Sequence, residues 1–180
     1  MKFGSYGLNV LAQDPESYRL SSLYSIDNEH EVTRTIALTT YESNMNEALK
    51  KAHEEIVQGG SIGSTLSKHG FKLIKEITFK GNVSEMPKEM NRLMNSNDNT
   101  FAALIYDLFA EKDGVVYPYS TIAEVYSPQY LTLSELNLIY PDSPTKDKEP
   151  GQVKEGLVEK ASEEKVQAMI NKMRDLMAGK

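Results

Sequence analysis

The sequence predicts an α+β fold, with a mainly antiparallel sheet of four to six strands, a long helix covering one face, and a tethered C-terminal amphipathic helix. Segments of alternating apolar and polar residues, typical of strands with one buried face, lie on both sides of a segment with helical spacing. Two β-rich runs meet at Asp113 and Gly114, a pair that favours a tight hairpin turn. A final apolar stripe with helical spacing follows a proline-containing charged stretch.

The first third of the chain is expected to form strands and then a helix. A strand is predicted at about 32–41, paired with an earlier strand across a turn at 27–28, and a short leading strand is predicted near 8–12. Apolar residues then recur at spacings of three and four over 45–58, which predicts the long helix. A strand beginning near Phe71 would make this a β-α-β unit, and we expect it to add one parallel pair.

The glycine-rich stretch QGGSIGSTLSKHG, residues 58–70, has the composition of a phosphate-binding loop but not its organisation. A Walker A loop follows a strand and contains a lysine, whereas this stretch follows a helix and GGSIGST has no lysine. The G-x-G-x-x-G fingerprint is also absent. We interpret the stretch as a bend in which Gly59 or Gly60 ends one helix, Ser61 caps a second, and Gly70 ends that one. No cofactor is predicted.

The second half begins with a strand from residue 71 and a short methionine-rich helix near 85–95. The hairpin at Asp113-Gly114 follows, and pairing Lys112 with Val115 predicts its register. Pro118 cannot donate a ladder hydrogen bond, so the second strand is expected at an edge there. The segment LTLSELNLIY, residues 131–140, fits either a short helix or an extended segment.

Composition divides the chain into three parts. Residues 1–140 are predicted to form the globular domain, 141–156 a flexible linker containing three prolines, and 157–180 an amphipathic helix. One face of this helix carries an apolar stripe, here called the methionine stripe. Its members are Val166, Met169, Met173 and Leu176. A methionine-lined stripe on a tether suits docking on its own domain, self-association or binding in a partner's groove.

Charge and composition exclude several classes of function. The chain has no cysteine, which excludes thiolate metal sites, thiol catalysis and disulfides. The net charge is −6, and residues 142–180 hold eight basic and eight acidic residues, so the whole excess lies in residues 1–141. An acidic body without basic clusters disfavours nucleic-acid binding. No apolar run approaches a membrane span, so we expect a soluble chain, either cytoplasmic or the mature part of an exported or lipid-anchored protein.

The three histidines do not predict a metal site. AHEEIV, residues 52–57, contains half of the zincin motif, but Val57 stands where the second histidine ligand is required. His53 is therefore interpreted as a residue on the solvent side of its helix. His69 lies beside a helix-ending glycine, where the helix dipole favours a cation.

Asp107 is the strongest candidate for a functional side chain. It interrupts an apolar strand, where a carboxylate is costly to bury without a partner. The predicted register places it opposite Ser120, with Glu124 on the same face opposite Ala103. Two carboxylates on one face would suit a ligand pocket or acid-base chemistry, with His69 as a further polar member. The alternative is a half-exposed face on which Asp107 is solvated.

Two functional hypotheses follow. The first is a non-catalytic interaction or assembly domain that acts through a sheet edge, the methionine stripe and the tyrosine-rich late strands, represented by Tyr117, Tyr119 and Tyr126. Its partner would be another protein or a second copy of the chain. The alternative is a ligand-binding domain or small enzyme with a pocket between the helix at 45–58 and the sheet, involving Asp107. The sequence contains no compact catalytic motif, which favours the first, and no catalytic residue is predicted.

Overall fold

The structure is a computed structural model that describes residues 6–141 and 156–179, with the side chains of the last helix described from residue 163. Six strands form one sheet: β1 (Tyr6–Asp14), β2 (Tyr18–Asp27), β3 (His30–Tyr41), β4 (Lys72–Ser84), β5 (Thr100–Lys112) and β6 (Val115–Tyr126). The described ranges contain five helices: α1 (Glu47–Val57), α2 (Ile62–Lys68), α3 (Lys88–Met94), α4 (Leu133–Ile139) and α5 (Gly156–Met177). The predicted α+β class is confirmed.

The strands lie in the order β1-β2-β3-β6-β5-β4, and all neighbouring strands are antiparallel. The prediction of one parallel strand pair was wrong. After β3 the chain passes through α1 and α2 to the far edge of the sheet, and the β5–β6 hairpin fills the space between β3 and β4. The segment from 41 to 71 is therefore a connection between distant strands and brings no parallel neighbours together.

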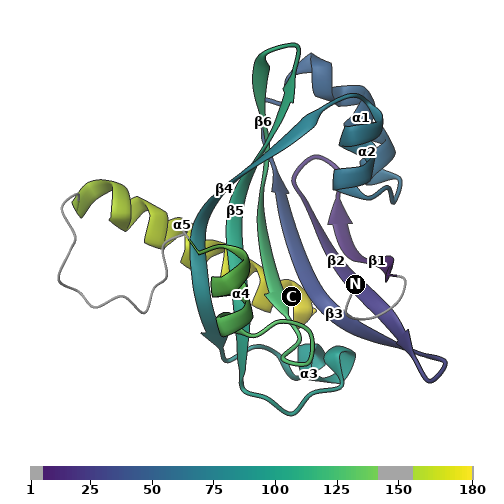
Figure 1. The fold of residues 1–180 in the computed structure, drawn as a ribbon, viewed down its shortest axis with the longest axis vertical. Helices are drawn as coiled ribbons and strands as arrows, with labels where there is room; N and C mark the ends of the chain where they lie inside the picture. The colour runs from purple at the N-terminus through teal and green to yellow at the C-terminus, as the bar shows by residue number, and fades with distance from the viewer. Residues whose placement is uncertain (1–5, 142–155, 180) are drawn as a thin grey trace.

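The two faces of the sheet carry different helices (Figure 1). One face, here the α1 face, includes Leu104, Tyr106 and Leu108, which pack with buried residues of α1, α2 and α4. The other, the α5 face, includes Ala103 and Ile105, which pack with buried residues of α3 and α5. Each face thus has its own apolar core, and no described helix covers a face alone. The expectation that the helix at 45–58 would do so is not confirmed.

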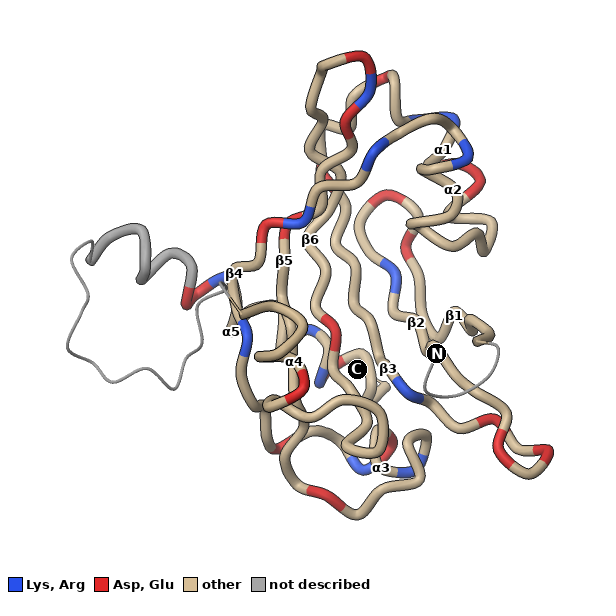
Figure 2. Tube along the Cα trace, viewed as in Figure 1, with Lys and Arg blue, Asp and Glu red and all other residues tan. Residues whose placement is uncertain are grey.

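Both predicted hairpins form, with turns that require a left-handed backbone. Asn28 and Glu29 have φ angles of 48° and 68°, one residue later than the predicted turn. Asp113 and Gly114 have φ angles of 54° and 77°, as a type I′ turn requires. Figure 2 shows acidic residues at the tips of both hairpins, in keeping with the acidic charge of the body.

The register of the β5–β6 hairpin agrees with the prediction only near its turn. Phe109 lies opposite Pro118 as expected, but a bulge then shifts the pairing by one residue, so Asp107 lies opposite Thr121. The same shift places Glu124 opposite Leu104. Because side chains alternate between faces, a one-residue shift moves each later β6 residue to the other face from the one predicted. β3 pairs with β6 only from residue 120 onward, so Pro118 lies at a local edge, as predicted.

The glycine-rich stretch is a bend between α1 and α2, as predicted. Gly59 and Gly70 have positive φ angles of 107° and 84° and follow the ends of the two helices. At Gly60, a Cβ would lie 2.8 Å from the Glu55 carbonyl oxygen, so the close approach of α1 and α2 needs glycine there. Ser61 precedes α2 but makes no side-chain cap. The segment at 131–140 proves to be helical, and Thr132 and Glu135 form a capping box at the start of α4.

The C-terminal helix docks on the sheet of its own chain. Met169, Ile170, Met173 and Met177 of α5 are buried in the core of the α5 face. Figure 1 shows α5 crossing behind the sheet, on the side opposite α4. The predicted amphipathic helix is therefore present, and its apolar face covers the strands. The predicted linker falls almost entirely on residues 142–155, which lie outside the described residues.

Candidate functional site

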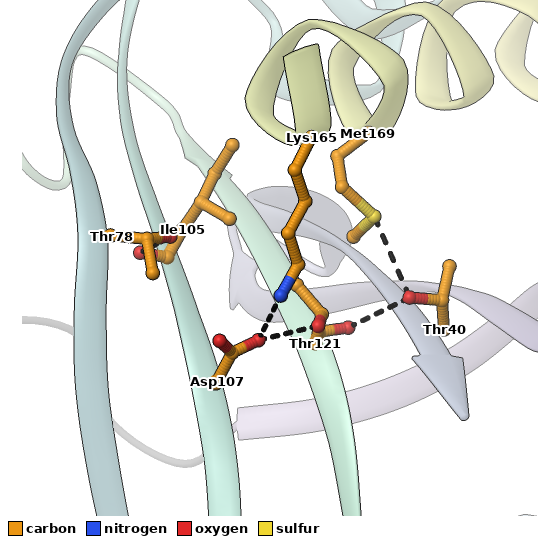
Figure 3. Close-up of polar contacts among 7 residues, drawn as sticks. All are labelled: Thr40, Thr78, Ile105, Asp107, Thr121, Lys165 and Met169. Atoms are coloured by element: carbon orange, nitrogen blue, oxygen red, sulfur yellow. Dashed lines mark hydrogen bonds and ion pairs between the residues drawn. The ribbon is translucent and has the colours of Figure 1, made fainter. Parts of the chain in front are cut away.

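Asp107 lies on the α5 face, where it binds α5. Its carboxylate Oδ1 accepts hydrogen bonds of 2.6 Å from Thr121 Oγ1 and 2.6 Å from Lys165 Nζ of α5 (Figure 3). The Lys165 and Asp107 side chains are 45% and 26% exposed, so this ion pair lies at the border of the core. The carboxylate that interrupts an apolar strand thus has a structural partner that was distant in sequence.

Further contacts join this ion pair to the middle of the sheet. The Thr121 carbonyl oxygen lies 3.5 Å from Thr40 Oγ1, which donates to it, and the same hydroxyl lies 3.6 Å from Met169 Sδ (Figure 3). These contacts connect β5, β6 and β3 with two successive turns of α5. The arrangement positions the helix on the sheet.

The structure does not bring the other predicted site residues to Asp107. Glu124 lies on the α1 face, so the expectation of two carboxylates on one face was wrong, because the bulge in β6 reverses its orientation. Ser120 pairs with Leu108 and is 4% exposed, and its hydroxyl has no hydrogen-bond partner among the described residues. His69 follows α2, and its Nε2 lies 2.8 Å from Glu55 Oε1.

The late tyrosines belong to the core of the α1 face and do not form an exposed surface. Tyr119 and Tyr126 are buried, and Tyr117 is half-buried against Phe71. The Tyr119 hydroxyl lies 3.0 Å from His53 Nδ1. The other ring nitrogen of His53 lies 2.9 Å from the Pro15 carbonyl oxygen, so this histidine joins α1 to the sheet. The prediction that His53 lies on the solvent side of its helix was therefore wrong.

The methionine stripe also packs against the sheet of its own chain. Met169 and Met173 are buried, and Val166 and Leu176 pack at the border of the same core. Binding of a second protein through this stripe would require α5 to leave the sheet.

A pocket of about 250 Å³ lies on the α1 face, between the sheet and the start of α2. Strand pairing explains why the sheet is hollow there. Ala37 lies between Ser21 and Glu124 in one row across β2, β3 and β6, and Thr39 lies between Arg19 and Ile122 in the next row. Short side chains at 37 and 39 leave space between longer ones on the flanking strands. The lining residues are Leu8, Arg19, Ser21, Leu23, Ala37, Thr39, Ser61, Ile62, Gly63, Leu73, Lys75, Tyr106, Leu108, Ile122 and Glu124.

Two buried polar side chains on the β2 side of this pocket each have an atom without a hydrogen-bond partner among the described residues. Arg19 is 3% exposed, and its Nη1 donates to the carbonyl oxygens of Ile56 at 3.0 Å and Gly60 at 2.8 Å. Its Nε has no hydrogen-bond partner among the described residues, and the same holds for the hydroxyl of Ser21, which is also 3% exposed. A buried polar group without a partner costs about 1–3 kcal/mol, and more if charged. Both atoms have less than 1 Å² of accessible surface, so they lie behind the pocket wall.

Glu124 stands on the β6 side of the pocket. Its Oε1 accepts a hydrogen bond of 3.0 Å from the Tyr106 hydroxyl, and its Oε2 accepts one from Tyr126. Burial first, and the Glu124 charge second, raise the pKa of both tyrosines, so they remain neutral donors near pH 7. Lys75 Nζ lies 4.4 Å from the centre of the Tyr106 ring. The site therefore has cations on two sides and a hydrogen-bonded carboxylate on a third.

Sequence reasoning missed Arg19, Ser21 and Lys75. Arg19 and Ser21 alternate with apolar residues of β2, which is the pattern of a wet strand face. Both faces of the sheet are covered, so these polar residues become buried, and only the tertiary structure shows that. Glu124 was singled out, but with the wrong neighbours.

Among the described side chains, those of residues 6–141 and 163–179, no three histidine, aspartate or glutamate residues are placed to hold a metal ion. None of the helices described in the structure is long and apolar enough to cross a membrane.

Neither a family model nor a curated protein matches the chain. Among solved structures, the chain is similar to a transcriptional regulator of the GntR family from Enterococcus faecalis, with 8% sequence identity and a TM-score of 0.41. The match covers 72% of this chain and 94% of that chain. A likeness at this level carries no argument about function, so the interpretation rests on the residues of the pocket.

Proposed function

We propose that the protein is a ligand-binding domain that takes a small polar molecule in the pocket on the α1 face. The observation that carries the proposal is a cavity whose lining combines apolar side chains with the charged residues Arg19, Lys75 and Glu124. Sites of this kind combine an apolar lining with a few convergent polar groups.

The size of the pocket limits the ligand. A volume of about 250 Å³ lies just below the range of about 300–1,000 Å³ that holds drug-sized molecules. It would hold about eight water molecules at about 30 Å³ each. The ligand would therefore be a small metabolite rather than a nucleotide or a peptide.

The lining favours binding over catalysis. The described lining residues include two serines but no histidine, so no serine there has a neighbouring imidazole base. Arg19 is held by two carbonyl oxygens, and its guanidinium group offers only hydrogen-bond donors. Such a group orients an anion and does not transfer protons.

The proposal is tested by screening a chemically diverse set of small fragments by NMR with the full chain. We expect a subset to shift the amide resonances of pocket residues, and we expect Ala37→Leu, which fills the hollow between Ser21 and Glu124, to abolish these shifts. Ala168→Leu is the matched control, because Ala168 is exposed on α5. Thermal unfolding of both variants checks that they fold. If no fragment shifts the pocket amides, or if Ala37→Leu binds like the wild type, the proposal is wrong.

A second candidate function is protein interaction through the β1 edge of the sheet. The observation that favours it is the exposure of apolar side chains there, with Val10 38% and Leu11 41% exposed. An edge strand with exposed apolar residues suits pairing with another strand. We expect Leu11→Glu to convert any dimer seen by sedimentation into a monomer. A monomeric wild type would eliminate self-association through this edge.

A further inference from the structure

The methionines of this protein gather on one side of the sheet. Six of the eight, five of them buried and one half-buried, lie in the core of the α5 face and are here called the methionine cluster: Met86, Met90, Met94, Met169, Met173 and Met177. Met45 packs instead at the border of the α1-face core. The chain has no cysteine, so its sulfur chemistry is that of methionine, and most of this sulfur lies between the sheet, α3 and α5.

We infer that the methionine cluster makes α5 a redox-sensitive device, in which oxidation of the sulfurs by a peroxide releases the helix from the sheet. In this reaction the thioether sulfur takes one oxygen atom from hydrogen peroxide and loses two electrons, and the peroxide is reduced to water. The product, methionine sulfoxide, is polar where the thioether was apolar, and methionine sulfoxide reductases restore the thioether. The inference goes beyond the proposed function and does not depend on the pocket of the α1 face.

The C-terminal end of α5 is where oxidation of the helix begins. Met177 is the last residue of α5 and is 7% exposed. Because helix ends fray locally, its sulfur becomes accessible without unfolding of the sheet. Met173 and Met169 lie on the same face at successive spacings of four residues. Each turn that leaves the sheet therefore exposes the next sulfur.

A sulfoxide is unfavourable in this core. The buried residues around the cluster include Phe79, Val83 and Phe101, whose side chains offer no hydrogen-bond donor. A sulfoxide oxygen is a hydrogen-bond acceptor, and a buried acceptor without a donor destabilises the state that buries it. The undocked helix places the same oxygen in water, so oxidation shifts the equilibrium toward release.

The polar contacts of α5 do not replace what the methionines contribute. Lys165 pairs with Asp107 at the border of the core, and Arg174 donates to the Ser84 carbonyl oxygen at 2.6 Å in an exposed position. Exposed contacts of this kind contribute little to stability, because water competes for both partners. Docking of α5 therefore depends on its apolar face, in which three of the buried side chains are methionines.

The test treats the full chain with hydrogen peroxide and follows backbone hydrogen exchange by mass spectrometry, which also locates each sulfoxide. We expect the α5 amides to exchange at least about tenfold faster after oxidation, because a buried acceptor without a donor favours the undocked helix by about that factor. The amides of α1, on the other face, should change by less than about twofold. Treatment with the two methionine sulfoxide reductases, one for each epimer, should restore slow exchange in α5.

Leucine variants assign the effect to the cluster. Met86→Leu combined with Met177→Leu removes the half-buried sulfur and the one at the end of α5, and leucine has a similar volume without a sulfur to oxidise. This double variant should keep α5 docked at the peroxide dose that releases it in the wild type. Met45→Leu is the matched control and should respond like the wild type, because Met45 is half-buried at the other face. Thermal unfolding before treatment checks that the variants fold.

Four results would overturn the inference. The first is a sulfoxide at Met177 without faster exchange in α5, and the second is equal acceleration in α5, α1 and the sheet, which indicates general unfolding. The third is a double variant that responds like the wild type. The fourth is oxidation of Met45 while the cluster stays reduced, which means that peroxide does not reach the cluster. Ligand binding in the pocket is measured separately, so the proposed function does not stand or fall with these results.

Discussion

Met173 offers a direct test of how α5 contributes to the fold. Its side chain is 0% exposed and lies in the core of the α5 face with residues of β4, β5, β6 and α3. Changing Met173 to Ala removes three heavy atoms from that core. At about 0.8 kcal/mol for each buried methylene-sized group, the transfer contribution is about 2.4 kcal/mol. The cavity left behind adds to this, and buried Met→Ala changes span about 2–5 kcal/mol.

We therefore expect Met173→Ala to lower the free energy of unfolding by about 3 kcal/mol, a large part of the 5–15 kcal/mol typical of a folded domain. The assay is urea unfolding of the full chain, followed by circular dichroism. Glu164→Ala is the matched control, because Glu164 is exposed on the same helix, and it should change stability by less than about 0.5 kcal/mol.

Docking within one chain also predicts that unfolding does not depend on protein concentration. Unfolding of an assembly held together by α5 from another chain would shift with concentration, by mass action. Sedimentation of the full chain and of a chain ending at Pro141 measures independently whether α5 holds separate chains together. If Met173→Ala is as stable as Glu164→Ala, or if the midpoint rises with concentration, docking of α5 on its own sheet is refuted.

Three further predictions follow from other contacts. Lys165→Met should lower the free energy of unfolding by about 0.5–1 kcal/mol, since the ion pair with Asp107 is partly exposed, and no loss in urea unfolding would show that the pair does not hold α5. Thr132→Ala removes the capping box of α4 and should cost about 1 kcal/mol, measured in the same way, with Thr132→Ser retaining most of the stability. Lys68 first, and His69 second, lower the pKa of Glu55 from 4.5, so this carboxylate stabilises the fold above about pH 4.5 and its contribution is lost as the pH falls through the lowered pKa. Glu55→Gln should therefore be less stable than the wild type at pH 7, and the difference should shrink below about pH 4 in urea unfolding; a constant difference would contradict this.

Local signals in the sequence predicted much of the fold. The Asp113-Gly114 pair predicted a type I′ hairpin, and helical spacing predicted α1, because turn chemistry and periodicity act over a few residues. The N-cap of α1 is Asn46, whose side chain accepts a hydrogen bond from the Ala48 backbone N–H. Strand order could not be read in this way, since it depends on which distant segments pair.

The candidate site shows the same limit at a finer scale. A single bulge in β6 moves Glu124 to the other face of the sheet. The sequence around Pro118 contains no pattern that predicts this bulge. The polar partner of Asp107 is Lys165, which lies 58 residues away in the chain. Neither contact has a local signal, so the sequence pointed to the right carboxylates and assigned them the wrong neighbours.

The sequence alone determined the class of the fold, the two hairpins, the bend at the glycine-rich stretch and the apolar face of the last helix. Each depends on backbone preferences or on the spacing of apolar residues within one element. Only the tertiary structure decided that both faces of the sheet are covered, that the methionine stripe is buried against the sheet of its own chain, and that Arg19 and Glu124 line the same pocket. These features depend on pairing between strands far apart in the chain, where one residue of register decides which face a side chain occupies.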